Sequence, residues 1–184
     1  MEIKLLIAGG MHMHFAKDIC DLIESSAKIR GTGIARREVD YIEKKISSGN
    51  AIIALKGKRL VGFCYIETWE HNQFVANSGL IVHPDFRNQG LARSIKTKAF
   101  KLAQDKYPSA KIFGITTNSG VMKINSDLGY RPVSFSELTQ DDTFWQGCKS
   151  CPKFDILERN QQGMCLCTAM LALSKNEILN QQKK

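Results

Sequence analysis

The spacing of apolar residues along this 184-residue chain predicts strands and amphipathic helices in irregular alternation. Apolar runs of strand length occupy residues 2–8, 51–55, 60–68, 74–82 and 111–116. Apolar residues at helical spacing mark helices near residues 15–28, 39–46, 91–106 and 118–128. A hairpin turn is expected at residues 56–59, between the second and third strands. This pattern predicts an α/β domain with a mixed, partly antiparallel sheet.

The junction between the fourth strand and the third helix has the composition of an anion-binding loop. The first N–H groups of a helix have no partner within the helix, and they carry partial positive charge. Gly90 lets the main chain approach a ligand closely, because it has no Cβ. Arg87 and Arg93 add full positive charges. The sequence therefore predicts a cradle for a phosphate or pyrophosphate, with an ordinary strand-to-helix turn as the alternative.

Two motifs resemble the GNAT superfamily of acyl-CoA-dependent N-acyltransferases. Residues 87–92 resemble its (Arg/Gln)-x-x-Gly-x-(Gly/Ala) signature. Residues 118–130 resemble its later motif, in which an Asn opens a helix that ends in Leu-Gly-(Phe/Tyr). The resemblance covers residues 1–136 and implies a mixed α/β fold with a mostly antiparallel sheet, whose middle strands diverge around CoA. We expect one domain over residues 1–173, including a cysteine-bearing section at 137–173, and a polar tail at 174–184.

The resemblance implies transfer of an acetyl or succinyl group from a CoA thioester to the amine of a small molecule. It assigns the backbone of Leu80, Ile81 and Val82 to the pantetheine amides, and Asn118 to a place beside that arm. It assigns the pyrophosphate to a loop made of Arg87, Asn88, Gln89, Gly90, Leu91 and Ala92.

The catalytic groups are less clear from the sequence. Many members carry a Tyr seven residues after the motif Asn, and this Tyr protonates the leaving thiolate. Here the position holds Asn125, whose amide can donate a hydrogen bond but cannot act as an acid. For the general base, Glu67 is the first candidate, before His71, His83 and a chain of waters.

The acceptor amine is indicated by a basic, glycine-containing loop after the first helix. Arg30 and Arg36 lie in this loop, and guanidinium groups bind carboxylates through two parallel hydrogen bonds. A dicarboxylate amino acid such as glutamate would suit them, and a solvated basic loop is the alternative. The chain also resembles small bacterial GNAT proteins linked with arginine biosynthesis, in which N-acylation of glutamate is the first step. The matching stretches are residues 30–36, 75–82, 111–117 and 164–170.

Four cysteines in the C-terminal section form a second constellation of candidate ligands, namely Cys148, Cys151, Cys165 and Cys167. Four thiolates could hold a structural zinc, because C-x-x-C and C-x-C spacings each direct two sulfurs to one side. Cysteine also packs as a small hydrophobic residue, and this interpretation is favoured over zinc. No secretory signal is expected, so the cysteines are predicted to be thiols in a cytoplasmic protein.

The formal net charge of +8 favours an anionic partner. Nucleic acid is not expected, because the chain has neither a block of basic residues nor interleaved aromatics. No apolar run is long enough to span a membrane, so no membrane partner is expected either. The expected partners are acyl-CoA and a small amine, and the sequence leaves a homodimer open. Two alternative functions stay open: acetylation of a protein or peptide, and non-catalytic sensing of CoA or a metal.

Overall fold

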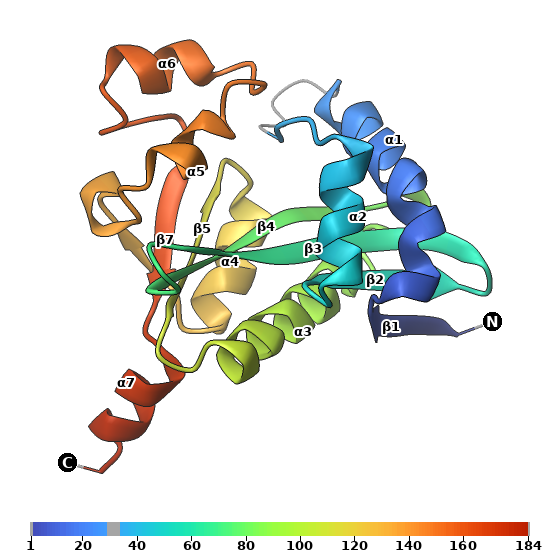
Figure 1. Ribbon diagram of the computed structural model, residues 1–184, viewed down its shortest axis with the longest axis horizontal. Coiled ribbons are helices and arrows are strands. Elements are labelled where there is room, and N and C mark those ends of the chain that lie inside the picture. Colours follow the sequence, from blue (N-terminus) through green and yellow to red (C-terminus); the bar gives the residue numbers. More distant parts are fainter. Residues whose placement is uncertain (1, 29–33, 184) are drawn as a thin grey trace.

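The computed structural model describes residues 2–28 and 34–183, and it is built around one seven-stranded sheet (Figure 1). The strand order is β1-β2-β3-β4-β5-β7-β6. Only β4 and β5 pair in parallel among these neighbours, and all the others are antiparallel. The strands are β1 (Ile3–Ile7), β2 (Ala51–Lys56), β3 (Arg59–Trp69), β4 (Phe74–Val82), β5 (Lys111–Thr116), β6 (Arg131–Val133) and β7 (Thr168–Ala172).

Helices cover both faces of the sheet. One face packs against α1 (Ala16–Ala27) and α2 (Val39–Ser47), and the other against α3 (Leu91–Lys106) and α4 (Ser119–Asp127). Shorter helices are α5 (Asp142–Gln146), α6 (Phe154–Arg159), α7 (Lys175–Gln181) and the 3-10 turns η1 (Gly10–Phe15), η2 (Pro84–Phe86) and η3 (Phe135–Glu137). None of the helices in the described ranges is long and apolar enough to cross a membrane.

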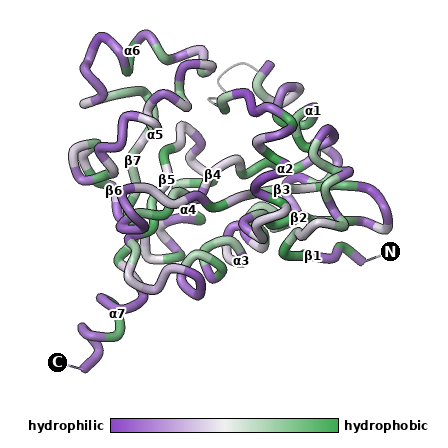
Figure 2. Tube along the Cα trace, in the orientation of Figure 1, coloured by the Kyte–Doolittle hydropathy of each residue, from purple (hydrophilic) through white to green (hydrophobic). Residues whose placement is uncertain are grey.

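The two cores follow from the alternation of side chains along the strands. On β2, Ile52 and Ala54 face the α3 side, whereas Ala51 and Ile53 face the α1 and α2 side. All four side chains are fully buried, which makes β2 apolar throughout its first half. Figure 2 shows the same hydrophobic colour along the central strands. Each large aliphatic side chain buried in this way stabilises the fold by about 1.5–3 kcal/mol.

The predicted α/β class and mixed, mostly antiparallel sheet are confirmed. The bounds of the strands at residues 74–82 and 111–116 match the prediction. The predicted polar tail contains a helix, α7, which the apolar pattern did not indicate because none of its residues is buried. A capping box between Ser174 and Glu177 explains its start, since each side chain accepts a hydrogen bond from the other residue's backbone N–H.

Two irregularities in the sheet shape the region around β4. The parallel pairing of β4 with β5 covers only the register from Phe74 to Ala76, and the two strands diverge beyond it. The register between β3 and β4 also shifts after Phe63, which marks a β-bulge. Gly79 lies at this bulge with a φ of +67°, a conformation that favours glycine. The sheet therefore opens at its centre, next to the start of α3.

Candidate functional site

A cleft of about 1050 Å³ occupies the region where β4 and β5 diverge. It is lined by the second half of β4, the end of β5, the N-termini of α3 and α4, the connection before α2, and the cysteine-bearing section. Figure 1 shows α2 and the cysteine-bearing section with α5 and α6 apart from each other, above the sheet. Segments far apart in the sequence thus form one continuous cleft.

The loop at residues 87–92 joins the end of β4 to the start of α3, as the sequence predicted. Gly90 is the N-cap of α3 with a φ of +77°, and Asn88 also has a positive φ of 60°. The helix begins at Leu91, so the N–H groups of its first turn have no acceptor within the helix and lie beside the cleft. Leu80, Ile81 and Val82 line the same cleft along β4. This end of the cleft can hold an anion and an extended amide chain.

The side chains of the loop are used differently from the prediction. Arg87 donates from Nε to the carbonyl of Val82 at 3.0 Å and from Nη2 to Ser26 at 3.3 Å, so it ties β4 to α1. Gln89 donates to the carbonyl of Asp85 and does not line the cleft. Arg93 forms a half-exposed ion pair with Asp127 at 2.7 Å. Both Arg87 and Arg93 nevertheless line the cleft, so their charges lie near the N-terminus of α3.

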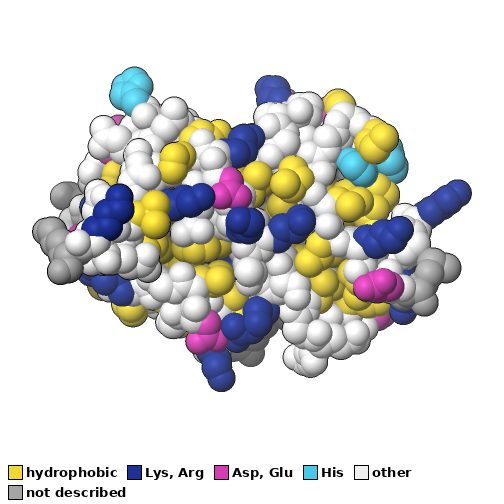
Figure 3. Space-filling view, turned by 90° about the horizontal axis from the view of Figure 1, so that it is seen from below, with side chains coloured by type: hydrophobic (Ala, Val, Ile, Leu, Met, Phe, Trp, Pro, Cys, Tyr) yellow, Lys and Arg dark blue, Asp and Glu magenta, His cyan; other side chains and the backbone are white. Residues whose placement is uncertain are grey.

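Basic side chains are plentiful on the surface below the sheet. Figure 3 shows lysine and arginine side chains gathered around the middle of the face seen from below, where Figure 1 places α3. A polyanion approaching the start of α3 from this side meets a favourable potential.

Asn118 and Asn125 lie on α4, on the β5 side of the cleft. Asn118 is the N-cap of the helix, and its side chain accepts a hydrogen bond from the N–H of Val121 at 3.0 Å. Asn125 is only 1% exposed, and its Nδ2 donates to the sulfur of Met170 at 3.5 Å. No donor within the described part of the chain reaches its Oδ1.

On the opposite wall, Glu67 belongs to a network of polar side chains. It accepts hydrogen bonds from Tyr41 and Lys45, and the pair with Lys45 is mostly buried. Tyr41 also reaches Tyr65, whose hydroxyl accepts a bond from Nε of Arg37 at 2.8 Å. Burial, with the neighbouring Tyr65 and Glu67, raises the pKa of Tyr41 above its ordinary value, so it stays a neutral donor. The network holds the Glu67 side chain in place at the cleft.

Of the other predicted candidates for the general base and the acceptor site, only Arg36 is seen to line the cleft in the described residues. His71 is exposed in the β3–β4 turn, and His83 contacts Arg59 and Asp85; neither lines the cleft. Arg36 is exposed at the cleft, whereas Arg30 lies outside the described residues. The neighbouring Arg37 has a side chain that is held in place by hydrogen bonds to Tyr65 and to the carbonyls of Ala35 and Arg36.

The four C-terminal cysteines line one wall of the cleft, namely Cys148, Cys151, Cys165 and Cys167. The first two are joined by a turn, with the N–H of Cys151 donating to the carbonyl of Cys148 at 2.8 Å. The last two precede β7 in a bend and do not form part of the strand. Burial and the neighbouring sulfurs raise the pKa of Cys167 to about 12. Within residues 2–28 and 34–183, no group of three His, Cys, Asp or Glu side chains is arranged to hold a metal ion.

Three lysines of the cleft were not among the predicted site residues. Lys149 and Lys153 follow Cys148, and no sequence motif singles them out. Lys96 lies in the third helix, and a signal for it exists: it interrupts the apolar stripe between Ile95 and Ala99. Its side chain is buried and lines the cleft.

Comparisons with known proteins agree with this geometry. Residues 34–120 match the model of the acetyltransferase (GNAT) family. No curated protein matched the chain. Among solved structures, the chain is similar to N-acetylglutamate synthase from Neisseria gonorrhoeae complexed with coenzyme A and N-acetyl-glutamate (TM-score 0.68, 16% identity). That alignment covers 95% of this chain and 35% of the synthase, so the chain spans about a third of the synthase's length.

Two further structures resemble the chain over most of both lengths. One is Rv2747 from Mycobacterium tuberculosis in complex with CoA (TM-score 0.65, 13% identity, covering 92% of this chain and 98% of that one). The other is a phosphinothricin acetyltransferase from Sinorhizobium meliloti in complex with acetyl-CoA (TM-score 0.62, 13% identity, 93% and 87%). The match over residues 34–120, the shared fold and the cleft at the diverging strands together show that the chain is similar to the acetyltransferase (GNAT) family and has the fold of enzymes crystallised with coenzyme A or acetyl-CoA.

Proposed function

We propose that the protein transfers an acetyl group from acetyl-CoA to the α-amine of a dicarboxylic amino acid, with glutamate as the leading candidate. The observation that carries this proposal is the guanidinium of Arg37, which Tyr65 holds in place at the cleft. Nε and Nη1 of Arg37 already donate to Tyr65 and to the carbonyls of Ala35 and Arg36, which leaves Nη2 of this fixed guanidinium to donate to a carboxylate in the cleft.

The charges around this end of the cleft favour an acidic acceptor. Arg36, Lys149 and Lys153 line the cleft together with Arg37. The acidic residue deepest in this network, Glu67, is already paired with Lys45. The excess of positive charge would therefore attract a substrate with two carboxylates, whereas it would repel a cationic one. Arg30, predicted to take part, lies outside the described residues.

The reaction can use groups on both walls. CoA would lie with its pyrophosphate at the start of α3 and its pantetheine arm along Leu80, Ile81 and Val82. A backbone N–H group of this segment, beside the bulge, would stabilise the oxyanion that forms at the thioester carbonyl. Glu67 is the proposed general base, because it lines the cleft from the side of Arg37.

The similarity to N-acetylglutamate synthase supports this proposal, because that protein was crystallised with CoA and N-acetyl-glutamate. The two proteins share the fold at 16% identity.

The test is a screen of free amino acids with acetyl-CoA, with release of the CoA thiol as the readout. Glutamate should give the highest kcat/KM. Arg37→Ala should raise the KM for glutamate at least about 30-fold, because losing a desolvated carboxylate contact costs about 2–5 kcal/mol. Arg37→Lys should recover only part of this loss, because an ammonium lacks the planar set of donors that can bond Tyr65 and a carboxylate at the same time. Arg36→Ala should show a smaller effect, because Arg36 is exposed.

Arg159→Ala is the matched control, since Arg159 is an exposed arginine of α6 that does not line the cleft. It should leave the kinetics unchanged. Acidic peptides and succinyl-CoA form two further arms. Higher kcat/KM on a peptide than on glutamate would overturn the acceptor assignment, and faster transfer from succinyl-CoA would overturn the donor assignment.

A further inference from the structure

Lys96 is the one charged residue with a buried side chain in the described part of the chain, and it is 2% exposed. It comes from α3, among the buried residues Ile95, Ala99 and Phe100. No carboxylate pairs with it in the described residues, and its Nζ donates one hydrogen bond, to the carbonyl of Asn77 at 3.3 Å. Burying an ammonium without a counterion costs several kcal/mol, which calls for a functional reason.

Nζ of Lys96 lies where β4 and β5 begin to diverge. Asn77 follows Ala76, the last β4 residue in register with β5, and Gly114 follows the partner Phe113. A Cβ built on Gly114 would lie 3.4 Å from the Asn77 carbonyl oxygen and 3.8 Å from Nζ of Lys96. Nζ therefore lies at the apex of the two diverging strands, and all three residues line the cleft.

Other polar atoms at this apex have no hydrogen-bond partner. Nδ2 of Asn77, Oδ1 of Asn125 and the hydroxyl of Tyr130 are buried and have no partner within hydrogen-bond distance in the described structure. Of these residues, Asn77 and Asn125 line the cleft. Buried amide groups are nearly always paired, so unpaired ones beside a cleft indicate a ligand that pairs with them. The apex thus offers an ammonium and two amides to whatever reaches the end of the cleft.

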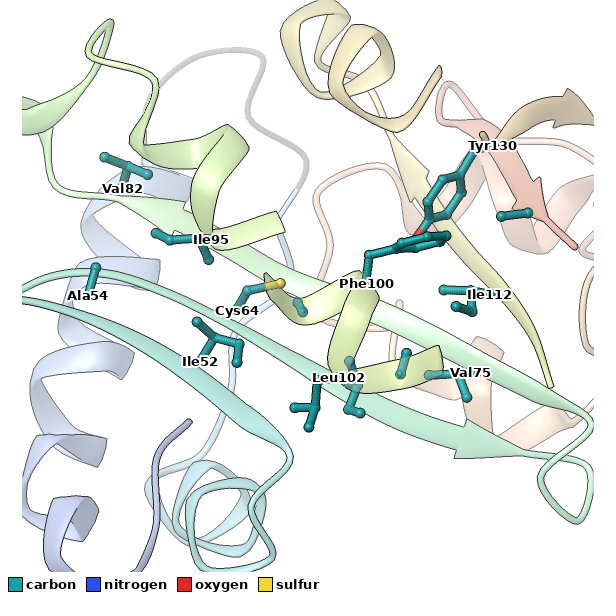
Figure 4. Packing of buried hydrophobic residues seen from close by; sticks show 14 of the residues in the cluster. Ile52, Ala54, Cys64, Val75, Val82, Ile95, Phe100, Leu102, Ile112 and Tyr130 are labelled. Atoms are coloured by element: carbon teal, nitrogen blue, oxygen red, sulfur yellow. The ribbon is translucent and has the colours of Figure 1, made fainter. Parts of the chain in front are cut away.

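The groups that face Lys96 are uncharged, so none of them holds its ammonium proton in an ion pair. Cys64 on β3 donates from its thiol to Oδ1 of Asn77 at 2.9 Å, and the Tyr130 ring lies 5.7 Å from Nζ. Figure 4 shows Cys64 near Ile95 and Phe100, and Tyr130 beside Phe100, so the surroundings are largely apolar. Burial raises the pKa of the Cys64 thiol to about 11, so Cys64 stays a neutral thiol, and burial lowers the pKa of Lys96, so its ammonium gives up a proton more readily than an exposed lysine does.

We propose that Lys96 is a catalytic residue that stabilises and protonates the sulfur of CoA as it leaves the acetyl group. The amine nitrogen forms the new C–N bond, the C–S bond breaks, and the electron pair stays on sulfur. Lys96 gives one Nζ proton to this sulfur and recovers a proton from solvent after CoA departs. The proton lost by the amine goes to Glu67 or to solvent.

This assignment accounts for Asn125, whose amide cannot supply a proton at the position where many superfamily members carry a Tyr. Desolvation brings the acidity of an ammonium closer to that of a thiol, which favours transfer between them. The inference rests on acetyl transfer from CoA and is independent of which amine accepts the group.

Lys96→Met tests the proposal, because Met fills a similar volume without the ammonium. Replacing an unpaired buried charge by an apolar side chain should leave the melting temperature unchanged or raised. We expect kcat to fall about 100-fold, the usual contribution of general acid catalysis, with a smaller change in the KM for acetyl-CoA. Lys98→Met on the same helix, away from the cleft, is the control and should keep wild-type kinetics.

A direct titration of bound CoA separates a catalytic role from a structural one. The thiolate absorbance of bound CoA, measured against desulfo-CoA to remove the protein's own thiols, should show a lower thiol pKa in the wild type than in Lys96→Met. The high-pH fall of kcat, where Lys96 loses its proton, should also disappear in the variant. A variant with kcat within twofold of wild type, or an unchanged thiol pKa, would overturn the proposal. This titration needs no acceptor, so it holds even if glutamate is not the substrate.

Discussion

Gly79→Ala tests how the bulge in β4 positions the acceptor end of the cleft. Gly79 has a φ of +67°, and a Cβ there would lie 2.6 Å and 2.8 Å from two ring carbons of Tyr65. Tyr65 is 1% exposed, so its ring has little room to move. Its hydroxyl is also the group that accepts the hydrogen bond from Arg37. One methyl group should therefore affect both stability and acceptor binding.

The magnitude has two parts. A non-glycine residue in the left-handed region costs about 1–2 kcal/mol. Overpacking against a buried ring adds about 1–3 kcal/mol. The sum of about 2–5 kcal/mol corresponds to a fall in melting temperature of about 4–20 °C for a domain of this size. The shift of Tyr65 should also raise the KM for the acceptor while leaving the dissociation constant for CoA nearly unchanged.

Gly49→Ala is the matched control, followed by thermal unfolding and steady-state kinetics on both variants. Gly49 has a φ of +65°, and nothing lies within 4 Å of a Cβ built there. It should show the backbone cost alone, with wild-type kinetics. Equal losses of stability in the two variants, or an unchanged acceptor KM in Gly79→Ala, would refute the argument that Tyr65 transmits the change.

Two further predictions concern the cofactor loop and the thiols. Gly90→Val should weaken CoA binding, measured by calorimetry, because φ of +77° is strongly unfavourable for a β-branched residue even though no neighbour lies within 4 Å; unchanged binding would place the pyrophosphate elsewhere. Burial and neighbouring sulfurs raise the pKa of Cys148 to about 11 and of Cys167 to about 12. Because the thiolate is the reactive form, alkylation of both should be slow at pH 7 and should accelerate as pH rises toward 11. Rapid labelling at pH 7, located by mass spectrometry, would contradict the observed environment.

Local sequence determined the elements that form the proposed cofactor side of the cleft. The strand at residues 74–82, the glycine before α3 and the Asn cap of α4 each depend on residues close in the chain. Periodicity, positive φ at Gly90 and the bond from Asn118 to the N–H of Val121 are short-range effects. For this reason they could be predicted without knowledge of the rest of the chain.

Tertiary structure decided how the side chains of the site are used. Arg87 looked like a phosphate ligand, but packing of α1 on the sheet brought Ser26 within its reach. Lys96 was not among the predicted site residues, and its burial depends on the two strands, β4 and β5, that diverge beside it. Arg37 acquires a fixed orientation only because Tyr65, 28 residues away, meets it across the fold. Such contacts depend on long-range packing, which a local pattern of residues does not encode.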